Sequence, residues 1–85
     1  MLIRFSSRFR KSYKKLSGNI KNKAQEKEKI FRINPFDACL DTHKLHGKYK
    51  NYWAFAIDSQ YRIMFIFTES ETVDFIDIGT HEIYK

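Results

Sequence analysis

The sequence has few of the residues that covalent cross-links, metal sites and membrane spans require. Its 85 residues include one cysteine, so no internal disulfide can form, and a single thiol does not make a zinc site. No apolar run approaches the roughly 20 residues that a membrane-spanning helix needs. With one proline, three glycines and 42% hydrophobic residues, the composition is too apolar for a disordered chain. We expect one domain spanning residues 1–85 in a reducing cytoplasm, without a metal or another cofactor.

Positive charge is concentrated in the first part of the chain. Residues 1–32 carry eleven Lys and Arg and two Glu, whereas residues 51–85 carry two Lys and Arg and six Asp and Glu, within a net charge of +6. A strongly basic segment suggests a polyanionic or acidic partner. Lysines that only solubilise exposed helix faces would give the same pattern, so charge alone leaves both interpretations open.

The first part of the chain predicts a short strand and two helices. Leu2–Phe5 is an apolar strand, after which Ser6 or Ser7 can cap a helix. Apolar residues at helical spacing mark one face of this helix: Phe5, Phe9, Tyr13 and Leu16. A second helix, from about Ile20 to Ile33, ends before Asn34-Pro35 because the residue preceding proline avoids the α region. The apolar stripe of the second helix is thinner: Ile20, Ala24, Ile30, Phe31 and Ile33.

A loop, a short strand and a basic turn are expected next. Residues 34–42 connect the two parts of the fold, with Phe36 and Leu40 as apolar anchors. Residues 43–46 favour a short strand and residues 47–51 a turn. Cationic and aromatic residues interleave around this turn: Lys44, Lys48 and Lys50 with Tyr49, Tyr52 and Trp53. Cations beside flat rings are typical of sites for single-stranded nucleic acid, although Trp53 fits a core strand better.

The last part of the chain predicts three strands. Runs rich in aromatic and β-branched residues at 52–57 and 61–67 form a hairpin across Asp58-Ser59-Gln60, and a third strand covers 72–78. We therefore predict an α+β fold: an N-terminal strand, a two-helix hairpin and an antiparallel meander, with the helices packed on one face of a single sheet. The N-terminal strand is expected to join the sheet beside the strand at 61–67.

Arg62 is a charged residue inside an apolar strand. A guanidinium cannot lose its proton to escape burial, so it must be paired or face a polar cleft. Strand alternation puts Arg62 on the side of Met64 and Ile66, opposite the more aromatic side that we assign to the helices. We expect Arg62 to lie on the open face of the sheet. A structural ion pair with Asp58 or Asp77 is the alternative.

His81 and Tyr84 are further candidates for chemistry. His81 follows the glycine that ends the last predicted strand, where a loop held by a rigid sheet suits acid–base work. A surface histidine without a chemical role is the alternative. Tyr84 lies three residues later, so a helical turn of the tail would place both side chains on one side. Tyr84 could then donate a proton or stack on a base, or merely close the edge of the core.

Four segments combine into one pattern across essentially the whole chain. They are FSSRFRKSYKKL after the first strand, INPFD after the second helix, HKLHGKYKNYWAFAIDSQYRIMFIF in the sheet and VDFIDIGTHEIYK at the end. The most specific combination is K-L-x-G, a Y-R-I strand and a late G-T-H. Together these segments resemble the RelE/ParE superfamily of toxins from type II toxin–antitoxin pairs, most closely its RelE- and YafQ-like branch.

The resemblance implies a RelE-like fold and an endoribonuclease that cleaves mRNA in the ribosomal A site without a metal. Arg62 matches the family's strand arginine, which would stabilise the transition-state phosphate. His81 matches the C-terminal histidine used as general acid or base, and His43 matches a histidine before the K/P-L-x-G turn. Tyr84 lies near the family's C-terminal aromatic residue. The active-site lysines of RelE-like members fall in the region of Lys44, Lys48 and Lys50.

The resemblance also implies the partners. A toxin of this kind is inhibited by an acidic antitoxin and contacts operator DNA only within the toxin–antitoxin complex. Its basic first helix would contact rRNA phosphates without sequence preference, here through Arg8, Lys11 and Lys15. Such an enzyme acts in the cytoplasm on ribosome-bound mRNA and has no membrane partner.

Two positions depart from the YafQ-like pattern. Ala56 stands where a second histidine is expected, and Gln60 stands where an aspartate is expected, with Asp58 displaced from that place. ParE-like members share the fold but inhibit DNA gyrase, and they generally lack the terminal histidine, so His81 favours the ribonuclease branch. The alternatives are a gyrase inhibitor and a degenerate homologue that binds only antitoxin and operator DNA.

Overall fold

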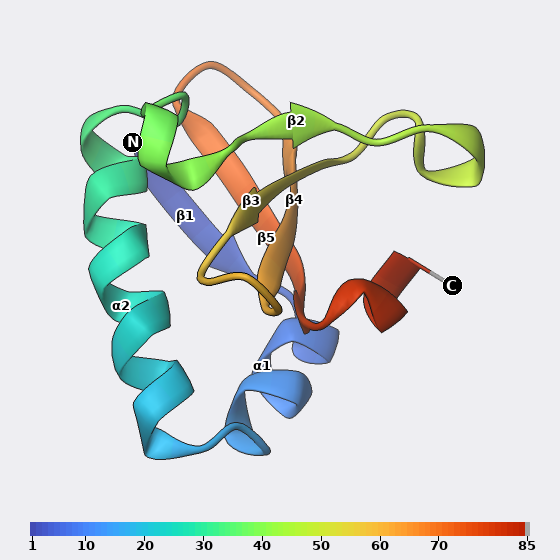
Figure 1. The fold of residues 1–85 in the computed structure, drawn as a ribbon. Coiled ribbons are helices and arrows are strands. Elements are labelled where there is room, and N and C mark those ends of the chain that lie inside the picture. The colour runs from blue at the N-terminus through green and yellow to red at the C-terminus, as the bar shows by residue number, and fades with distance from the viewer. Residues whose placement is uncertain (85) are drawn as a thin grey trace.

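The computed structural model describes residues 1–84, which form two helices and a five-stranded sheet (Figure 1). The helices are α1 (Ser7–Lys14) and α2 (Gly18–Ile33). The strands are β1 (Leu2–Phe5), β2 (His43–Lys44), β3 (Trp53–Ala56), β4 (Arg62–Phe67) and β5 (Thr72–Gly79). A single 3₁₀ turn, His81–Tyr84, follows β5 and is called the C-terminal turn below. The predicted α+β class, N-terminal strand and helical hairpin are confirmed.

The strand order is β1-β5-β4-β3-β2, with β1 parallel to β5 and the other neighbours antiparallel. The prediction that the first strand lies beside residues 61–67 is wrong, because β1 pairs with β5 and Leu2 lies opposite Thr72. β4 already has β3 along one edge and β5 along the other. The meander therefore leaves the outer edge of β5 for the N-terminal strand.

Each helix begins at a serine cap. The Ser6 hydroxyl accepts a hydrogen bond from the Phe9 amide at 3.0 Å, and the Ser17 hydroxyl accepts one from the Ile20 amide at 3.3 Å. A serine cap contributes about 1 kcal/mol to helix stability. Because Ser17 is the cap, α2 starts at Gly18, two residues before the predicted start. Its end is as predicted, since Ile33 is the last helical residue.

The apolar stripes of the helices face the sheet, with one exception. Phe9 of α1 and Ala24 and Phe31 of α2 are buried, whereas the side chain of Ile33 is 87% exposed. The assignment of Ile33 to the stripe is therefore wrong. Successive helical residues are about 100° apart, so two positions separate Ile33 from Phe31 by about 200° around the axis. When Phe31 points to the sheet, Ile33 must point away from it.

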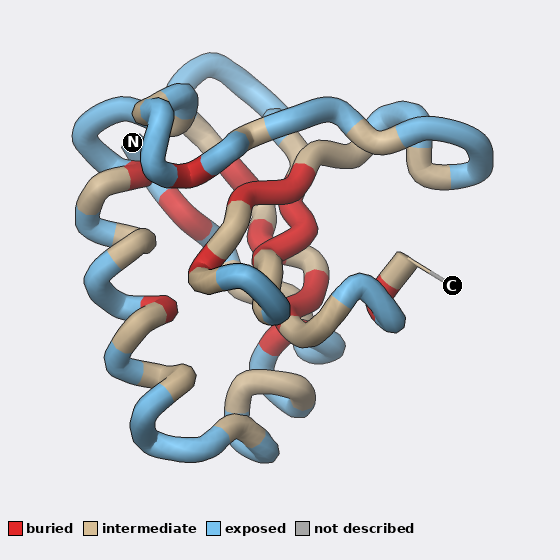
Figure 2. Tube along the Cα trace, in the orientation of Figure 1, coloured by how far each residue is buried: buried red, intermediate tan, exposed pale blue. Residues whose placement is uncertain are grey.

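Phe31 lies at the centre of the core. Its ring stacks on Phe55 with a centroid separation of 4.7 Å, and it meets Phe65 edge-on at 4.9 Å and Phe75 at 5.6 Å. Burying a phenylalanine side chain contributes about 1.5–3 kcal/mol. Figure 2 shows that burial is concentrated in the strands and reaches α2 only at intervals along its length. This cluster therefore fixes α2 on one face of the sheet.

The connections mostly follow the predicted loops. Leu40 is fully buried as an anchor, whereas Phe36 is 55% exposed, although its ring contacts Trp53 at 5.6 Å. The strand predicted over 43–46 is shorter, because the chain turns through Gly47 at a φ of +67°. That left-handed conformation favours glycine. No helix within residues 1–84 is long and apolar enough to cross a membrane.

Candidate active site

The pairing register assigns Arg62 to the face of the sheet opposite the helices, which is called the open face below. Residues directly opposite each other on neighbouring strands point to the same side of a sheet. Arg62 pairs with Ala56 on β3 and with Gly79 on β5. The next residue, Ile63, belongs to the core under the helices, and strand side chains alternate. The open-face position predicted for Arg62 therefore agrees with the register.

His43 lies on the same open face as Arg62. It pairs with Ala54, and Ala54 pairs with Met64, which alternates with Ile63 on β4. The side chain of His43 is exposed, and its Nδ1 lies 2.9 Å from the Asp41 carbonyl oxygen. Two strand spacings, about 10 Å, separate the backbones of β2 and β4. His43 and Arg62 therefore lie on the same face of the sheet, but their strands are not adjacent.

Arg62 lines a hollow of about 330 Å³ at the end of β4, together with four other residues: Ser59, Gln60, Thr80 and His81. Its guanidinium makes no hydrogen bond or ion pair within the part of the chain that the structure describes. The two expected alternative partners are bound elsewhere. Asp58 pairs with Lys23 at 3.4 Å, and Asp77 pairs with Arg8 at 2.8 Å. The guanidinium is thus available to an anion that enters the hollow.

The tail turns helically, which brings Tyr84 to the same region. The Tyr84 hydroxyl is buried and has no hydrogen-bond partner among residues 1–84. Burial raises the pKa of the Tyr84 phenol, and the nearby charge of Arg62 offsets part of that shift. The phenol therefore keeps its proton at neutral pH and has a free donor. His81, at the start of the same turn, is exposed.

The lysines of the basic turn do not form one cluster. Lys44 pairs with Trp53, which packs against the core under the helices, so Lys44 lies on the opposite face from Arg62. Lys48 lies over the ring of Tyr49, with 5.2 Å between its Nζ and the ring centroid. The loop between β2 and β3 extends from the sheet on the side away from α2, as the C-terminal turn does (Figure 1). Lys48 and Lys50, both exposed, belong to this loop.

The cations predicted on α1 differ in what they contact. Lys11 and Lys15 are exposed. Arg8 is exposed as well, but it forms an ion pair with Asp77, which is only 5% exposed. Contacts of Lys11 and Lys15 with rRNA stay a prediction, whereas an rRNA contact by Arg8 would compete with its ion pair. The structural partner of Arg8 was not predicted from the sequence, although Asp77 itself was a signal, because it is an acid between two isoleucines.

The positions that depart from the YafQ-like pattern lie around the hollow. Ala56 is directly opposite Arg62, and Gln60 lines the hollow. Asp58 does not face Arg62; its carboxylate accepts hydrogen bonds from the amides of Gln60 at 2.9 Å and Tyr61 at 2.7 Å, which shapes the turn. Within residues 1–84 no group of three His, Cys, Asp or Glu side chains is placed to hold a metal ion. Arg62 and His81 line the hollow, whereas Tyr84 lies close enough to feel the charge of Arg62 but is not part of the lining.

Comparison with known proteins points to one group of folds. No protein-family model and no curated protein matches the sequence. The structure of YafQ from E. coli strain BL21(DE3) matches with a TM-score of 0.79 and 22% identity, covering 96% of this chain and 94% of that chain. A YoeB/ParE toxin from Agrobacterium tumefaciens matches with a TM-score of 0.79 and 15% identity, over 95% and 99%. The E. coli DinJ-YafQ toxin-antitoxin complex gives a TM-score of 0.76 at 22% identity, over 95% and 92%. The chain therefore has the fold of YafQ and YoeB/ParE-type toxins.

Proposed function

We propose that the protein is the toxin of a type II toxin–antitoxin pair, and that it cleaves mRNA in the ribosomal A site as a metal-independent endoribonuclease. One observation carries this proposal. The guanidinium of Arg62, unpaired within residues 1–84, lines a hollow with His81 on the face that the helices leave open. The fold shared with YafQ and YoeB toxins supports the same function.

Arg62 suits the phosphate of an RNA backbone. Its planar fork of N–H donors can bind two phosphate oxygens at once. In the proposed reaction the 2′-oxygen of one nucleotide attacks the adjacent phosphorus, and the bond from phosphorus to the 5′-oxygen of the next nucleotide breaks. The products are a 2′,3′-cyclic phosphate and a 5′-hydroxyl. Arg62 stabilises the negative charge that builds on the phosphate oxygens in the transition state.

Two imidazoles flank Arg62 across the sheet and suit the two proton transfers. His43 is on β2 to one side of β4, and His81 follows β5 on the other side. One imidazole removes the proton of the 2′-hydroxyl, and the other gives a proton to the departing 5′-oxygen, as imidazoles do near neutral pH. The Tyr84 hydroxyl keeps its proton at neutral pH and donates a hydrogen bond to a phosphate oxygen once substrate binding exposes it.

The ribosome supplies the positioning that this site lacks. His81 and His43 are exposed, so the chain by itself encloses little of a substrate. A ribosome that holds the mRNA in place converts the reaction into an effectively unimolecular one, which lowers the barrier substantially. Lys11 and Lys15 on α1 are proposed to contact rRNA phosphates, and Lys48 and Lys50 the mRNA. The reaction then takes place in the cytoplasm, where ribosomes work.

The proposed inhibitor is an acidic antitoxin, and operator DNA is contacted only through the complex of the two proteins. The basic character of this chain, with a net charge of +6, complements such a partner. Chains with this fold are present in the DinJ-YafQ toxin-antitoxin complex and in the YoeB-YefM complex from Staphylococcus aureus. A neighbouring reading frame for a small acidic protein would support the pairing.

The test is cell-free translation of a defined mRNA followed by primer extension. Wild-type protein, Arg62→Ala and His81→Ala are compared, with Arg32→Ala as a charge-matched control because Arg32 pairs with Glu28 on α2. We expect cuts within translated codons for wild type and for the control, and few or none for the two site variants. The same mRNA without ribosomes should stay intact, and the fragments should carry 2′,3′-cyclic phosphate ends.

Two outcomes would overturn the nuclease proposal. Uncut mRNA together with inhibited supercoiling by purified DNA gyrase would favour a ParE-like inhibitor. Uncut mRNA with active gyrase, while an antitoxin still binds, would favour a degenerate homologue. Rapid cleavage of protein-free RNA would instead contradict the dependence on the ribosome.

A further inference from the structure

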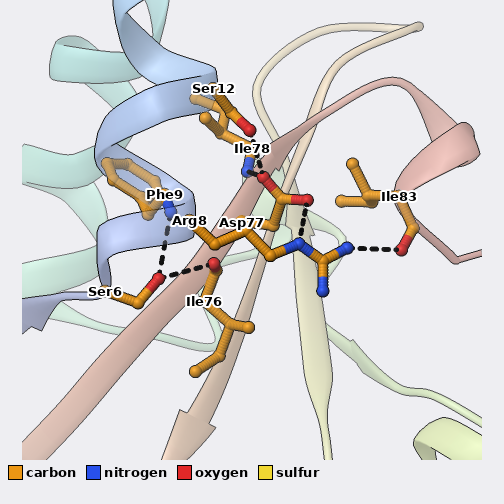
Figure 3. A network of polar contacts seen from close by, with 8 residues as sticks. All are labelled: Ser6, Arg8, Phe9, Ser12, Ile76, Asp77, Ile78 and Ile83. Carbon is orange, nitrogen blue, oxygen red and sulfur yellow. Dashed lines mark hydrogen bonds and ion pairs between the residues drawn. The ribbon is translucent and has the colours of Figure 1, made fainter.

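Asp77 is a buried carboxylate that accepts three hydrogen bonds (Figure 3). Its Oδ1 accepts hydrogen bonds from the Ser12 hydroxyl at 2.6 Å and from the Ile78 amide at 2.8 Å. Its Oδ2 accepts one from Nε of Arg8 at 2.8 Å. A buried charge without such partners would cost several kcal/mol. Asp77 therefore fixes the Arg8 guanidinium between α1 and the end of β5.

The fixed guanidinium of Arg8 also contacts the C-terminal turn. Its Nη2 donates to the carbonyl oxygen of Ile83 at 3.4 Å, as Figure 3 shows. A bond of this length is weak, but the orientation of the donor is set by the shorter bond to Asp77. The Ile83 amide in turn donates to the Thr80 carbonyl at 3.0 Å, which closes the turn. Ile83 is thus bound through both of its backbone groups.

The side chain of Ile83 packs against Gly79 at the end of β5. A Cβ added to Gly79 would lie 2.9 Å from Cγ2 of Ile83, closer than real Cβ atoms approach. The isoleucine is buried against this glycine, and Gly79 is also the residue that pairs with Arg62. The C-terminal turn is therefore held from two sides directly beside Arg62, by Arg8 and by Gly79.

We infer that Arg8 is a positioning residue, which Asp77 orients and which holds the C-terminal turn so that His81 and Tyr84 face Arg62. The residue that it binds, Ile83, lies between the two side chains proposed for chemistry. Arg8 itself does not line the hollow. The effect of Arg8 on cleavage rests on the proposed function, whereas its effect on the placement of the turn does not.

The first test measures single-turnover cleavage on ribosomes programmed with a defined mRNA. Arg8→Gln and Arg8→Lys are compared with Arg4→Gln, because Arg4 also bonds through Nε to an aspartate of β5, Asp74. We expect both Arg8 variants to lower the saturating rate about tenfold, because a misplaced catalytic group can cost up to about a hundredfold. The ribosome concentration for half-maximal rate should stay unchanged. Lysine should not restore the rate, since one ammonium cannot replace the two-sided guanidinium.

The second test uses the protein alone, so it does not depend on any activity. Amide hydrogen exchange at Ile83 and the imidazole NMR signals of His81 are recorded in the same three variants and in Gly79→Ala. We expect faster exchange at Ile83 and shifted His81 signals in both Arg8 variants. Gly79→Ala should give the same signature without a change of charge, because the new methyl group displaces Ile83. Arg4→Gln should leave both signals as in wild type.

Several results would overturn the inference. One is a folded Arg8→Gln protein whose amide exchange at Ile83 and His81 signals are the same as in wild type. Another is an Arg8→Lys protein that cleaves mRNA at the wild-type rate. A variant whose only defect is a higher half-maximal ribosome concentration would make Arg8 an rRNA contact instead. If the spectroscopic changes appear but wild-type protein cuts no mRNA, the proposed function fails while the placement of the turn stands.

Discussion

Among residues 1–84, the Tyr84 hydroxyl is a buried polar group without a hydrogen-bond partner. An unsatisfied buried hydroxyl costs about 1–3 kcal/mol. Groups left in that state are candidates for binding something else. In the proposed reaction that partner is a phosphate oxygen held by Arg62.

We therefore expect Tyr84→Phe to separate stability from activity. Removing the hydroxyl should leave the free energy of unfolding unchanged or raise it by about 1 kcal/mol, because an unsatisfied group is lost. Cleavage on the ribosome should fall about tenfold or more, because a transition-state hydrogen bond is lost. Urea denaturation and primer extension measure the two effects. Lower stability with full activity would contradict the assigned role.

Asp58 gives a prediction for pH dependence. Hydrogen bonds from the Tyr61 amide, followed by those from the Gln60 amide and Lys23, hold the pKa of the Asp58 carboxyl below its usual range despite its partial burial. Because the folded pKa is below the unfolded value of about 3.9, the stabilisation is complete above that value and is lost as pH falls through the folded pKa.

Asp58→Ala should accordingly lower the free energy of unfolding by about 1–2 kcal/mol at pH 7, through the loss of charge-assisted hydrogen bonds. The difference from wild type should shrink as the pH falls below about 4. Urea denaturation at a series of pH values provides the measurement. A difference that stays constant down to pH 2 would show that the charge of Asp58 does not contribute.

At the scale of elements, the packing of α2 against the sheet depends mainly on one large side chain, that of Phe31. Phe31 contacts rings from β3, β4 and β5, and nothing else on the helix is as deeply placed apart from Ala24. Phe31→Ala should lower the free energy of unfolding by about 3–5 kcal/mol, because a large cavity forms in the core. Ile33→Ala, two positions along the same helix, should change it by less than about 0.5 kcal/mol, since that side chain is exposed. Comparable losses in the two variants would contradict the packing described for α2.

The helices and strands themselves are more predictable from the sequence than the pairing of one strand with another. The caps, helix ends and strand alternation are local, so the serine cap at Ser6, the end of α2 and the face of Arg62 could be derived from short stretches of sequence. The pairing of β1 with β5 could not, because it depends on which sheet edge the meander leaves open. Distance along the chain groups Lys44 with Lys48 and Lys50, but the strand register places Lys44 on the face of the sheet opposite Arg62.

The candidate site was predictable only in part, for the same reason. Arg62 is recognisable because it is a charged residue inside an apolar strand, and His81 and Tyr84 because they follow the glycine that ends the last strand. The ion pair between Arg8 and Asp77 joins residues 69 positions apart, and no local pattern connects them. Which cation pairs with Asp77 therefore depends on the packing of α1 against β5.

At the scale of the whole molecule, the uneven charge distribution predicts salt-sensitive binding to ribosomes. Lys11→Gln combined with Lys15→Gln should weaken binding at low salt, and the slope of log affinity against log salt should become shallower by about one to two. Lys29→Glu on α2 is the charge-matched control, since it also lowers the net charge by two and Lys29 is exposed but is not proposed to contact rRNA. Filter binding at several salt concentrations measures the slopes. Equal slopes for the double variant and wild type would exclude contacts by these two lysines.

The pairing of Leu2 with Thr72 has a consequence for the order of folding. Local hairpins close quickly, whereas joining segments that are about 70 residues apart carries a large loop-closure entropy and is slow. The meander of β3, β4 and β5 can thus form before β1 and α1 dock on it. Because Arg8 arrives with α1, the C-terminal turn gains its second support only at that late step. Before β1 pairs with β5, the protein would then have most of its sheet folded, but the C-terminal turn with His81 and Tyr84 would not yet be held beside Arg62.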